Sequence, residues 1–213
     1  MKTALVAGSS GLIGSQLLSL LLEDNRYGKI IAISRRPLEL THPKLENVVL
    51  DFDQLKQHSQ ALKSDDIFCC LGTTIKKVKT KEAFRKVDFE YPLELARIGK
   101  EQGAENYLLV SALGANKNSS LFYNQVKGEV EDAISKIGIP TLHIFRPSLL
   151  VGPRSEQRSG EEAAKWVYKI FGFMIPNKYM AIESIKVARA MISIAQEKVK
   201  GIIIHESKEL QGY

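Results

Sequence analysis

The chain has 213 residues, of which 44% are hydrophobic and 25% are charged, and its formal net charge is +6. This length is enough for one domain with a sizeable core, and the composition is ordinary for a soluble globular protein. No apolar run reaches the length of a membrane span, and the first residues lack the features of a secretory signal. We therefore expect a cytoplasmic protein that does not bind a membrane.

The charges and the cysteines exclude several other classes of protein. The densest basic cluster, Lys76 to Lys81, is expected to be a solvated loop, with attraction of an anionic cofactor or of nucleic acid as the alternatives. No helix-turn-helix, zinc finger or aromatic-basic motif supports a nucleic-acid partner, and the four histidines show no metal-ligand spacing. Cys69 and Cys70 are neighbours in an apolar run, where a bond between them would be strained, so we expect reduced core residues.

Short apolar runs that favour β-strands recur along the whole chain, and most are continuous, as in parallel strands that are covered on both faces. The predicted strands are residues 3–7, 29–34, 47–50, 66–71, 106–110, 141–145 and 202–205.

Helical patterns alternate with these runs. A helix over 12–22 follows a glycine-rich turn, and a second begins after the N-cap Thr80 and ends near Gly103. A third is expected to be capped by Ser119 or Ser120 and to stop at Gly138, and a final helix covers about 184–197. Strict alternation predicts an α/β fold, a doubly wound parallel sheet with helices on both faces.

The region after Phe145 has a different character. Residues 153–160 are polar and are expected to form a mobile loop, a helix containing Trp166 and Phe171 comes next, and 172–180 are apolar but irregular. This region is too short for a core of its own. We expect residues 1–213 to form a single domain, in which about 147–182 make a small C-terminal substrate cap.

A glycine-rich turn joins the first predicted strand to the first helix, with the spacing Gly-x-x-Gly-x-x-Gly. The first glycine permits a tight turn, the second lets backbone amides approach a pyrophosphate, and the third lets the helix pack closely on the sheet. The start of the helix then stabilises the phosphate charge. The alternative is a purely structural turn. The predicted cofactor-binding segment is Gly8, Ser9, Ser10, Gly11, Leu12, Ile13 and Gly14.

The end of the second strand predicts which dinucleotide binds. An enzyme that uses NAD usually has Asp or Glu there, bound to the ribose hydroxyls, whereas this strand ends in Ser34-Arg35-Arg36. No carboxylate repels a phosphate, and two guanidinium groups are available to bind one. The sequence therefore favours NADP(H) over NAD(H), with two solvated arginines before Pro37 as the alternative.

Two further strand ends lie at the carboxyl edge of the predicted sheet, where ligands bind in such folds. Asp51-Phe52 follows the third strand, and a carboxylate there could accept from the adenine amino group. It could equally be a helix N-cap, for which Asp53 is well placed. The fourth strand ends in Leu71-Gly72-Thr73, where glycine lets the backbone approach the cofactor ribose.

Tyr123 and Lys127 are four residues apart on one predicted helix and so share a face, and Ser111 lies just after the fifth strand. A free tyrosine has a pKa of about 10, but an ammonium group and an oxidised nicotinamide both favour the phenolate. Tyr123 could then exchange a proton with a substrate oxygen, while Ser111 polarises that oxygen and Lys127 holds the ribose. The alternative is a chance pair, with Tyr123 in the core and Lys127 in solvent.

Taken together, these residues resemble the short-chain dehydrogenase/reductase superfamily, and specifically the atypical, Tat-interacting-protein-like family of NADPH-binding oxidoreductase-like proteins. The resemblance extends over nearly the whole chain. The stretches that carry it most specifically are Tyr123-Asn124-Gln125-Val126-Lys127-Gly128-Glu129-Val130-Glu131 and Phe145-Arg146-Pro147-Ser148-Leu149-Leu150.

The resemblance implies a Rossmann fold, bound NADP(H), an active site on Ser111, Tyr123 and Lys127, and backbone after Pro147 near the nicotinamide carboxamide. Many superfamily members carry Asn where this chain has Asp88, so Asp88 either substitutes for it or only contacts the cofactor. The cap is short compared with sugar-nucleotide epimerases of the superfamily, which argues against a nucleotide-sugar substrate. Members often dimerise through the helices that follow the fourth and fifth strands, which makes a homodimer one expectation.

Two functions remain open at this point. The first is an NADPH-dependent reductase or dehydrogenase of a small carbonyl or alcohol, with the proton exchanged at Tyr123. The second is a non-catalytic NADP(H)-binding regulator or sensor that acts through partner proteins.

Overall fold

The computed structural model describes residues 1–153 and 180–213. Seven strands form one sheet in the order β3-β2-β1-β4-β5-β6-β9, and all neighbouring strands pair in parallel. All seven predicted strands are confirmed, with small shifts at their ends. They are β1 (Lys2–Ala7), β2 (Tyr27–Ser34), β3 (Leu45–Val49), β4 (Asp66–Cys69), β5 (Asn106–Val110), β6 (Thr141–Arg146) and β9 (Gly201–Glu206).

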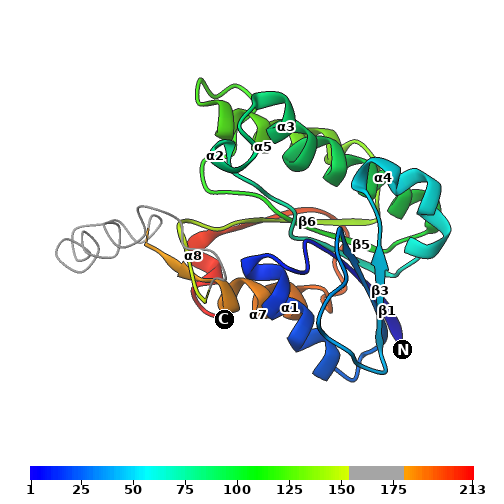
Figure 1. The fold of residues 1–213 in the computed structure, drawn as a ribbon. Coiled ribbons are helices and arrows are strands. Elements are labelled where there is room, and N and C mark those ends of the chain that lie inside the picture. The colour runs from blue at the N-terminus through cyan, green and yellow to red at the C-terminus, as the bar shows by residue number, and fades with distance from the viewer. Residues whose placement is uncertain (154–179) are drawn as a thin grey trace.

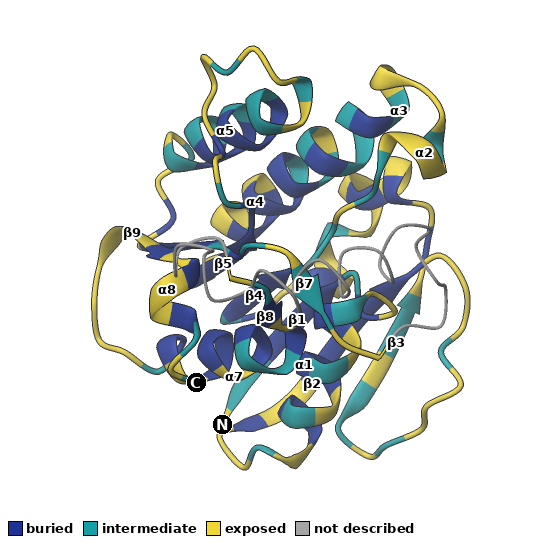
Figure 2. Cartoon of the chain, turned by 90° about the vertical axis from the view of Figure 1, so that its left-hand side faces the viewer, coloured by how far each residue is buried: buried dark blue, intermediate teal, exposed yellow. Residues whose placement is uncertain are grey.

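Helices cover both faces of this sheet (Figure 1). On one face α1 (Leu12–Glu23) and α7 (Ser184–Ile194) pack in the same core cluster as Ala4 and Val6. On the other face the 3₁₀ helix η1 (Phe52–Leu62), α4 (Tyr91–Gln102) and α5 (Phe122–Ser135) pack with Leu5 and Ala7. Successive residues of a strand point to opposite faces, so a fully apolar strand supplies both cores. Figure 2 shows the central strands buried between helices whose outer faces are exposed, while the edge strands β3 and β9 carry exposed residues.

The prediction of a single helix between Thr80 and Gly103 is wrong in one respect. It is divided into α3 (Lys81–Arg85), a π-helical turn η2 (Lys86–Glu90) and α4. The amide of Tyr91 donates to the carbonyl of Lys86, five residues earlier, and Pro92 follows, which has no amide hydrogen to give to the preceding turn. Asp88, which is buried, lies within this turn.

Several helix ends differ from the prediction. Thr80 is confirmed as an N-cap, since its hydroxyl accepts from the amide of Ala83 at 3.1 Å. Ser119 and Ser120 do not cap α5: its N-cap is Leu121, and the Ser119 hydroxyl accepts from the Leu121 amide instead. α5 ends at Ser135, before Gly138, and α7 ends at Ile194, before the predicted Glu197.

The described residues include only the base of the predicted cap. There β7 (Leu150–Val151) pairs in parallel with β8 (Ile182–Glu183). Most of the expected polar loop, the helix with Trp166 and Phe171, and most of the apolar segment at 172–180 lie outside the described residues. Two short helices, α2 (Ile75–Val78) and α8 (Ser207–Leu210), complete the described elements.

Among the helices of residues 1–153 and 180–213, none combines the length and the apolar character needed to span a bilayer. The same residues contain no cluster of three or more His, Cys, Asp or Glu side chains that could hold a metal ion. Cys69 and Cys70 are free, and Cys69 is buried, as expected for reduced core residues.

A buried carboxylate joins the amino ends of the central strands. Asp66 of β4 is fully buried and lies 3.0 Å from the ammonium group of Lys2 on β1. It also accepts from the hydroxyl of Tyr27 at 2.6 Å and from the amide of Asn106 at 2.7 Å. Side chains from β1, β2 and β5 therefore satisfy the buried carboxylate of β4, at the edge of the sheet opposite the glycine turn.

A pair of histidines lies in the sheet beside the α7 core. His143 of β6 is fully buried, and its Nδ1 lies 3.1 Å from Nε2 of His205 on β9. Burial and the neighbouring His205 lower the pKa of His143 to about 4. Since an unfolded histidine titrates near pH 6.5, the folded chain binds fewer protons than the unfolded chain between these values.

We expect the free energy of unfolding to fall as the pH is lowered from about 6.5 to about 4, with a slope of up to about 1.4 kcal/mol per pH unit from His143. Urea denaturation at a series of pH values measures this slope. His143→Leu should flatten it, whatever the variant does to the stability at neutral pH. His58→Gln changes an exposed histidine and should leave the slope as it is. A slope equal in His143→Leu and the wild-type protein would contradict the assignment.

Candidate functional site

The glycine turn brings the start of α1 against the end of β1. Gly8 has a φ of +86°, and a Cβ atom there would lie 2.6 Å from the carbonyl oxygen of Cys70. A Cβ atom on Gly14 would lie only 2.1 Å from the carbonyl oxygen of Gly8. Both positions therefore require glycine, the first for its conformation and its contact and the second for the close packing of helix on turn.

The amino end of α1 is open. Its N-cap is Gly11, no side chain caps it, and its first turn contains no acidic residue. Ser10 and Gly11 are exposed, whereas Ser9 and Ile13 are buried, so Ser9 and Ile13 can offer a ligand little more than their backbone. Uncapped amides at a helix start carry a partial positive charge, and this arrangement fits the pyrophosphate of a dinucleotide.

The two arginines after β2 lie on an ordered turn at the same edge. Arg35 and Arg36 are both exposed, and among the described residues neither forms an ion pair. The hydroxyl of Ser34 donates to the carbonyl of Arg36 at 2.6 Å, and the side-chain amide of Asn47 donates to Ser34 at 2.8 Å. The role of Asn47 was not predicted, although a polar residue at the start of the predicted strand 47–50 was a signal for it.

The side chains of the segment after β3 mainly stabilise the local fold, where the sequence predicted cofactor contacts. Asp51, not Asp53, is the N-cap of η1, since its carboxylate accepts from the amide of Asp53 at 3.1 Å. Asp53 instead pairs with Lys86 at 2.6 Å. Phe52 is 7% exposed and packs against Tyr91, with ring centroids 5.4 Å apart. Phe52 could therefore contact a cofactor mainly through its backbone, whereas the side chain of Asp51 is exposed.

A buried ion pair lies beside the end of β4. The ammonium group of Lys127 is 2.8 Å from Oδ1 of Asp88, and the two side chains are only 6% and 1% exposed. The other carboxylate oxygen of Asp88 accepts from the amide of Thr73 at 2.8 Å. Gly72 lies next to the pair, since a Cβ there would lie 3.6 Å from Asp88 and 3.9 Å from Lys127. Leu71 packs against the core.

Burial alone lowers the pKa of Lys127. The charges of Asp88 and of an ionised Tyr123 act in the opposite direction, and together they raise the pKa of Lys127 above that of an ordinary lysine. The ammonium group therefore stays charged at neutral pH although it is buried.

Tyr123 lies one helical turn before Lys127 and is 42% exposed. Its ring packs against Phe84 of α3, with centroids 5.8 Å apart. The chance-pair hypothesis expected a buried tyrosine and a solvated lysine, and the structure shows the reverse. Tyr123 is the exposed member of the two and Lys127 the buried one, and an accessible tyrosine is a group that can exchange a proton with a bound molecule.

Ser111 is held by a residue that the sequence analysis did not single out. Its hydroxyl donates to Glu131, and Arg146 donates to both oxygens of that carboxylate, with distances of 3.1 and 2.6 Å. Glu131 is one turn beyond Lys127, so Tyr123, Lys127 and Glu131 follow one another along α5 at intervals of four residues. That spacing was the available signal.

Pro147 lies immediately after β6 and is buried. Its carbonyl accepts from the amide of Leu113 at 2.9 Å, in the loop that follows Ser111. The ends of β5 and β6 are therefore connected at the carboxyl edge, on the same side as the glycine turn.

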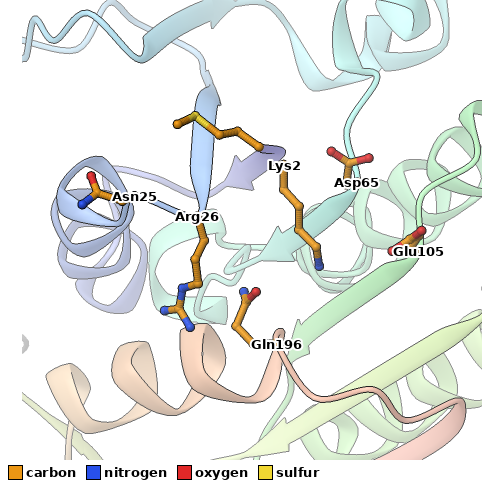
Figure 3. Close-up of a pocket in the computed structure, with 7 residues that line it drawn as sticks. Lys2, Asn25, Arg26, Asp65, Glu105 and Gln196 are labelled. Atoms are coloured by element: carbon orange, nitrogen blue, oxygen red, sulfur yellow. The ribbon is translucent and has the colours of Figure 1, made fainter.

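A hollow of about 530 Å³ lies at the opposite edge of the sheet (Figure 3). Its two cationic side chains already have partners: Lys2 pairs with Asp66, and Arg26 pairs with Asp24 at 2.5 Å. It is also far along each strand from the glycine turn, since its walls come from the amino ends of the strands. We do not assign it to the cofactor. Its lining residues are Met1, Lys2, Asn25, Arg26, Asp65, Glu105 and Gln196.

Comparison with known proteins identifies the family. Residues 4–123 match the model of the NAD dependent epimerase/dehydratase family. The chain is 36% identical to Protein HTATIP2 of Rattus norvegicus over 199 residues, which are 90% of this chain and 80% of that protein. The chain belongs to the NAD dependent epimerase/dehydratase family. As the sequence predicted, these relatives are atypical members of the short-chain dehydrogenase/reductase superfamily, with an NAD(P)-binding fold.

Solved structures share the fold. An enzyme WbmH from Bordetella bronchiseptica in complex with NAD+ matches with a TM-score of 0.75 and 17% identity, covering 97% of this chain and 76% of that one. A UDP-glucose 4-epimerase from Thermotoga maritima matches with a TM-score of 0.73 and 18% identity, covering 96% and 76%. At this identity the likeness concerns architecture, and it confirms the Rossmann-type sheet predicted from the sequence.

The comparisons correct the expected location. A relative from Debaryomyces hansenii, 33% identical over 92% of this chain and 88% of its own length, is named Protein FMP52, mitochondrial. A relative from Candida albicans carries the same name. The expectation of a cytoplasmic protein is therefore wrong. It was a default drawn from composition, and neither composition nor fold carries a signal for a compartment.

The close packing at Gly14 can be tested directly. Gly14→Ala places a Cβ 2.1 Å from the carbonyl oxygen of Gly8, so the backbone must shift, and we expect a loss of about 1–3 kcal/mol of stability. Urea denaturation measures the change. Ser15→Ala is the matched control, since it alters an exposed neighbour on the same helix. Equal stability of the two variants would show that the contact does not constrain the turn.

Proposed function

We propose that the protein is an NADP(H)-dependent oxidoreductase that transfers hydride between nicotinamide and a small carbonyl or alcohol, with Tyr123 as the acid or base. The observation that carries this proposal is that Tyr123 is exposed while Lys127, one helical turn away, is buried and held as an ion by Asp88. The ammonium group of Lys127 lies beside Gly72, which follows the carboxyl end of β4 on the side of the glycine turn.

Each residue has a distinct role in this proposal. Tyr123 gives a proton to the substrate oxygen or takes one from it, and Lys127 stabilises the phenolate and binds ribose hydroxyls. Ser111 faces the substrate oxygen from the end of β5, with its orientation set by Glu131. The dinucleotide, when bound, supplies or accepts the hydride.

The preference for NADP(H) is supported by the end of β2. Arg35 and Arg36 are exposed there, on a turn that Ser34 and Asn47 hold in place. A 2′-phosphate at that position would meet two guanidinium groups and no carboxylate from the strand end.

A second function is favoured by one contact. The hydroxyl proton of Ser111 is donated to Glu131, and so is not available to polarise a substrate carbonyl while that bond lasts. This arrangement would suit a protein that binds the dinucleotide as a regulator or sensor. A homodimer through α4 and α5 stays a prediction for either function.

Replacing Tyr123 separates the two functions. Tyr123→Phe removes the exchangeable proton but keeps the ring that packs on Phe84, so we expect turnover to fall at least about 100-fold while the affinity for NADPH is unchanged. NADPH oxidation with a panel of small aldehydes, ketones and quinones gives the turnover, and calorimetry gives the affinity. A wild-type protein that binds NADPH but turns over no member of the panel would favour the regulator. A parallel loss of affinity would contradict the role of Tyr123.

Cofactor preference is tested by replacing both arginines. The double variant Arg35→Ala/Arg36→Ala should bind NADPH at least about tenfold more weakly and NADH about as well as before, because only NADPH carries the 2′-phosphate. Lys198→Ala/Lys200→Ala removes the same charge from an exposed segment at the amino end of β9 and should change neither affinity. If NADH binds more tightly than NADPH to the wild-type protein, the preference is refuted.

A further inference from the structure

Strand β9 ends the sheet and carries apolar side chains that are open to solvent. It pairs with β6 on one side, and among the described strands none lies on its other side. Figure 2 shows β9 at the edge of the molecule. Ile202 and Ile204 are 55% and 43% exposed, although both are large aliphatic side chains. An exposed apolar edge strand readily pairs with another strand, so this edge is a candidate interface.

The core beneath α4 and α5 stops one strand before the sheet does. In the parallel register Leu142 lies beside Ile202 and Ile144 beside Ile204, which places all four side chains on one face of the sheet. Leu142 and Ile144 are only 3% and 2% exposed and belong to the core cluster that includes residues of α4 and α5. The apolar face of the sheet therefore extends beyond the helices that cover it.

The backbone of β9 is also open along this edge. The amide of Gly201 donates to the carbonyl of Pro140 at 2.9 Å, on the β6 side. Because the backbone groups of alternate residues point to the same side of a strand, the amides and carbonyls of Ile202 and Ile204 point away from β6. β9 contains no proline, and its pairing with β6 has no bulge, so it lacks two of the devices that keep an edge strand from pairing.

Residues of opposite charge flank the two isoleucines. Lys200 precedes them and Glu206 follows them, both are exposed, and the spacing of two residues puts them on the same face as the isoleucines. Glu206 also lies 3.1 Å from Arg146, and half of its side chain stays exposed. This face of the strand is Lys-Ile-Ile-Glu in one direction and Glu-Ile-Ile-Lys in the other. It is therefore complementary to an antiparallel copy of itself.

We propose that β9 pairs with β9 of a second copy of this chain, antiparallel and about a two-fold axis at Ile203, so that the two sheets join into one. Ile202 then lies opposite Ile204 of the partner subunit, and these two residues exchange a pair of backbone hydrogen bonds. Lys200 lies opposite Glu206 of the partner subunit. The two-fold axis is perpendicular to the sheet, so the four isoleucines form one apolar strip on a shared face.

The charges select this register over its neighbours. A shift of two residues in one direction places Lys200 opposite an isoleucine, and a shift in the other direction places Glu206 opposite one. A shift of one residue brings backbone groups that point outward against groups that point inward. The interface lies at the end of the sheet, so it is separate from the homodimer predicted through α4 and α5, and it does not depend on the proposed function.

Sedimentation velocity over about a hundredfold range of protein concentration tests this interface. The wild-type protein should convert from monomer to dimer as the concentration rises. Lys200→Glu places two carboxylates opposite each other at both ends of the interface, and Glu206→Lys does the same with two ammonium groups. Each single variant should therefore dimerise at least about tenfold more weakly.

An equimolar mixture of the two variants tests the register itself. In the mixed dimer every Glu at position 200 faces a Lys at position 206 and the reverse, so the mixture should dimerise about as tightly as the wild-type protein. Lys56→Glu makes the same change of net charge on the exposed surface of η1. By itself it should dimerise normally, and mixing it with Glu206→Lys should not restore a mixed dimer.

The apolar strip is tested by Ile202→Thr/Ile204→Thr, which keeps two β-branched side chains that suit a strand and should also weaken the dimer at least about tenfold. Circular dichroism confirms that each variant is folded. A wild-type protein that stays monomeric at every concentration overturns the proposal. A dimer that none of these variants weakens assigns the association to another face, and a mixture that fails to restore the dimer overturns the register.

Discussion

The buried ion pair between Lys127 and Asp88 constrains the whole carboxyl edge of the sheet. Two charges removed from water are stable only if they meet each other and satisfy their remaining hydrogen bonds, and the loss of one partner typically costs about 3–5 kcal/mol. In this fold the requirement connects α5 to the turn η2, and the amide of Thr73 connects η2 to the end of β4. Three segments distant in sequence are therefore held in one arrangement.

The two edges of the sheet use charge in different ways. At the amino edge the carboxylate of Asp66 is saturated by Lys2, Tyr27 and Asn106, and the network has no remaining capacity to bind a ligand. At the carboxyl edge the start of α1 is uncapped, and the backbone of Gly72 lies next to the ion pair. In a parallel sheet all the loops that follow strands lie at the carboxyl edge. The amides at the start of α1 and the residues after β4 are therefore near one another, where one dinucleotide can contact both.

Prediction from the sequence succeeded where one short-range rule decides the structure. Short apolar runs, most of them continuous, predicted all seven strands of the sheet, and the glycine spacing predicted the turn before α1. It failed where a partner distant in sequence decides. Nothing local distinguishes Ser119 from an N-cap, and the contacts of the Asp88 carboxylate depend on where Lys127 and Thr73 lie. Likewise, the contact of Ser111 with Glu131 requires β5 and α5 to be packed together.

The sequence by itself determined the alternation of strands and helices, the family, and the side chains available at the carboxyl edge, because periodicity and glycine spacing act within one element or one turn. Only the tertiary structure decided that Lys127 is buried and Tyr123 exposed, and that Glu131 and Asp88 engage Ser111 and Lys127. The reason is that burial and charge pairing depend on which residues of different elements pack together, and these contacts form only when the helices pack on the sheet.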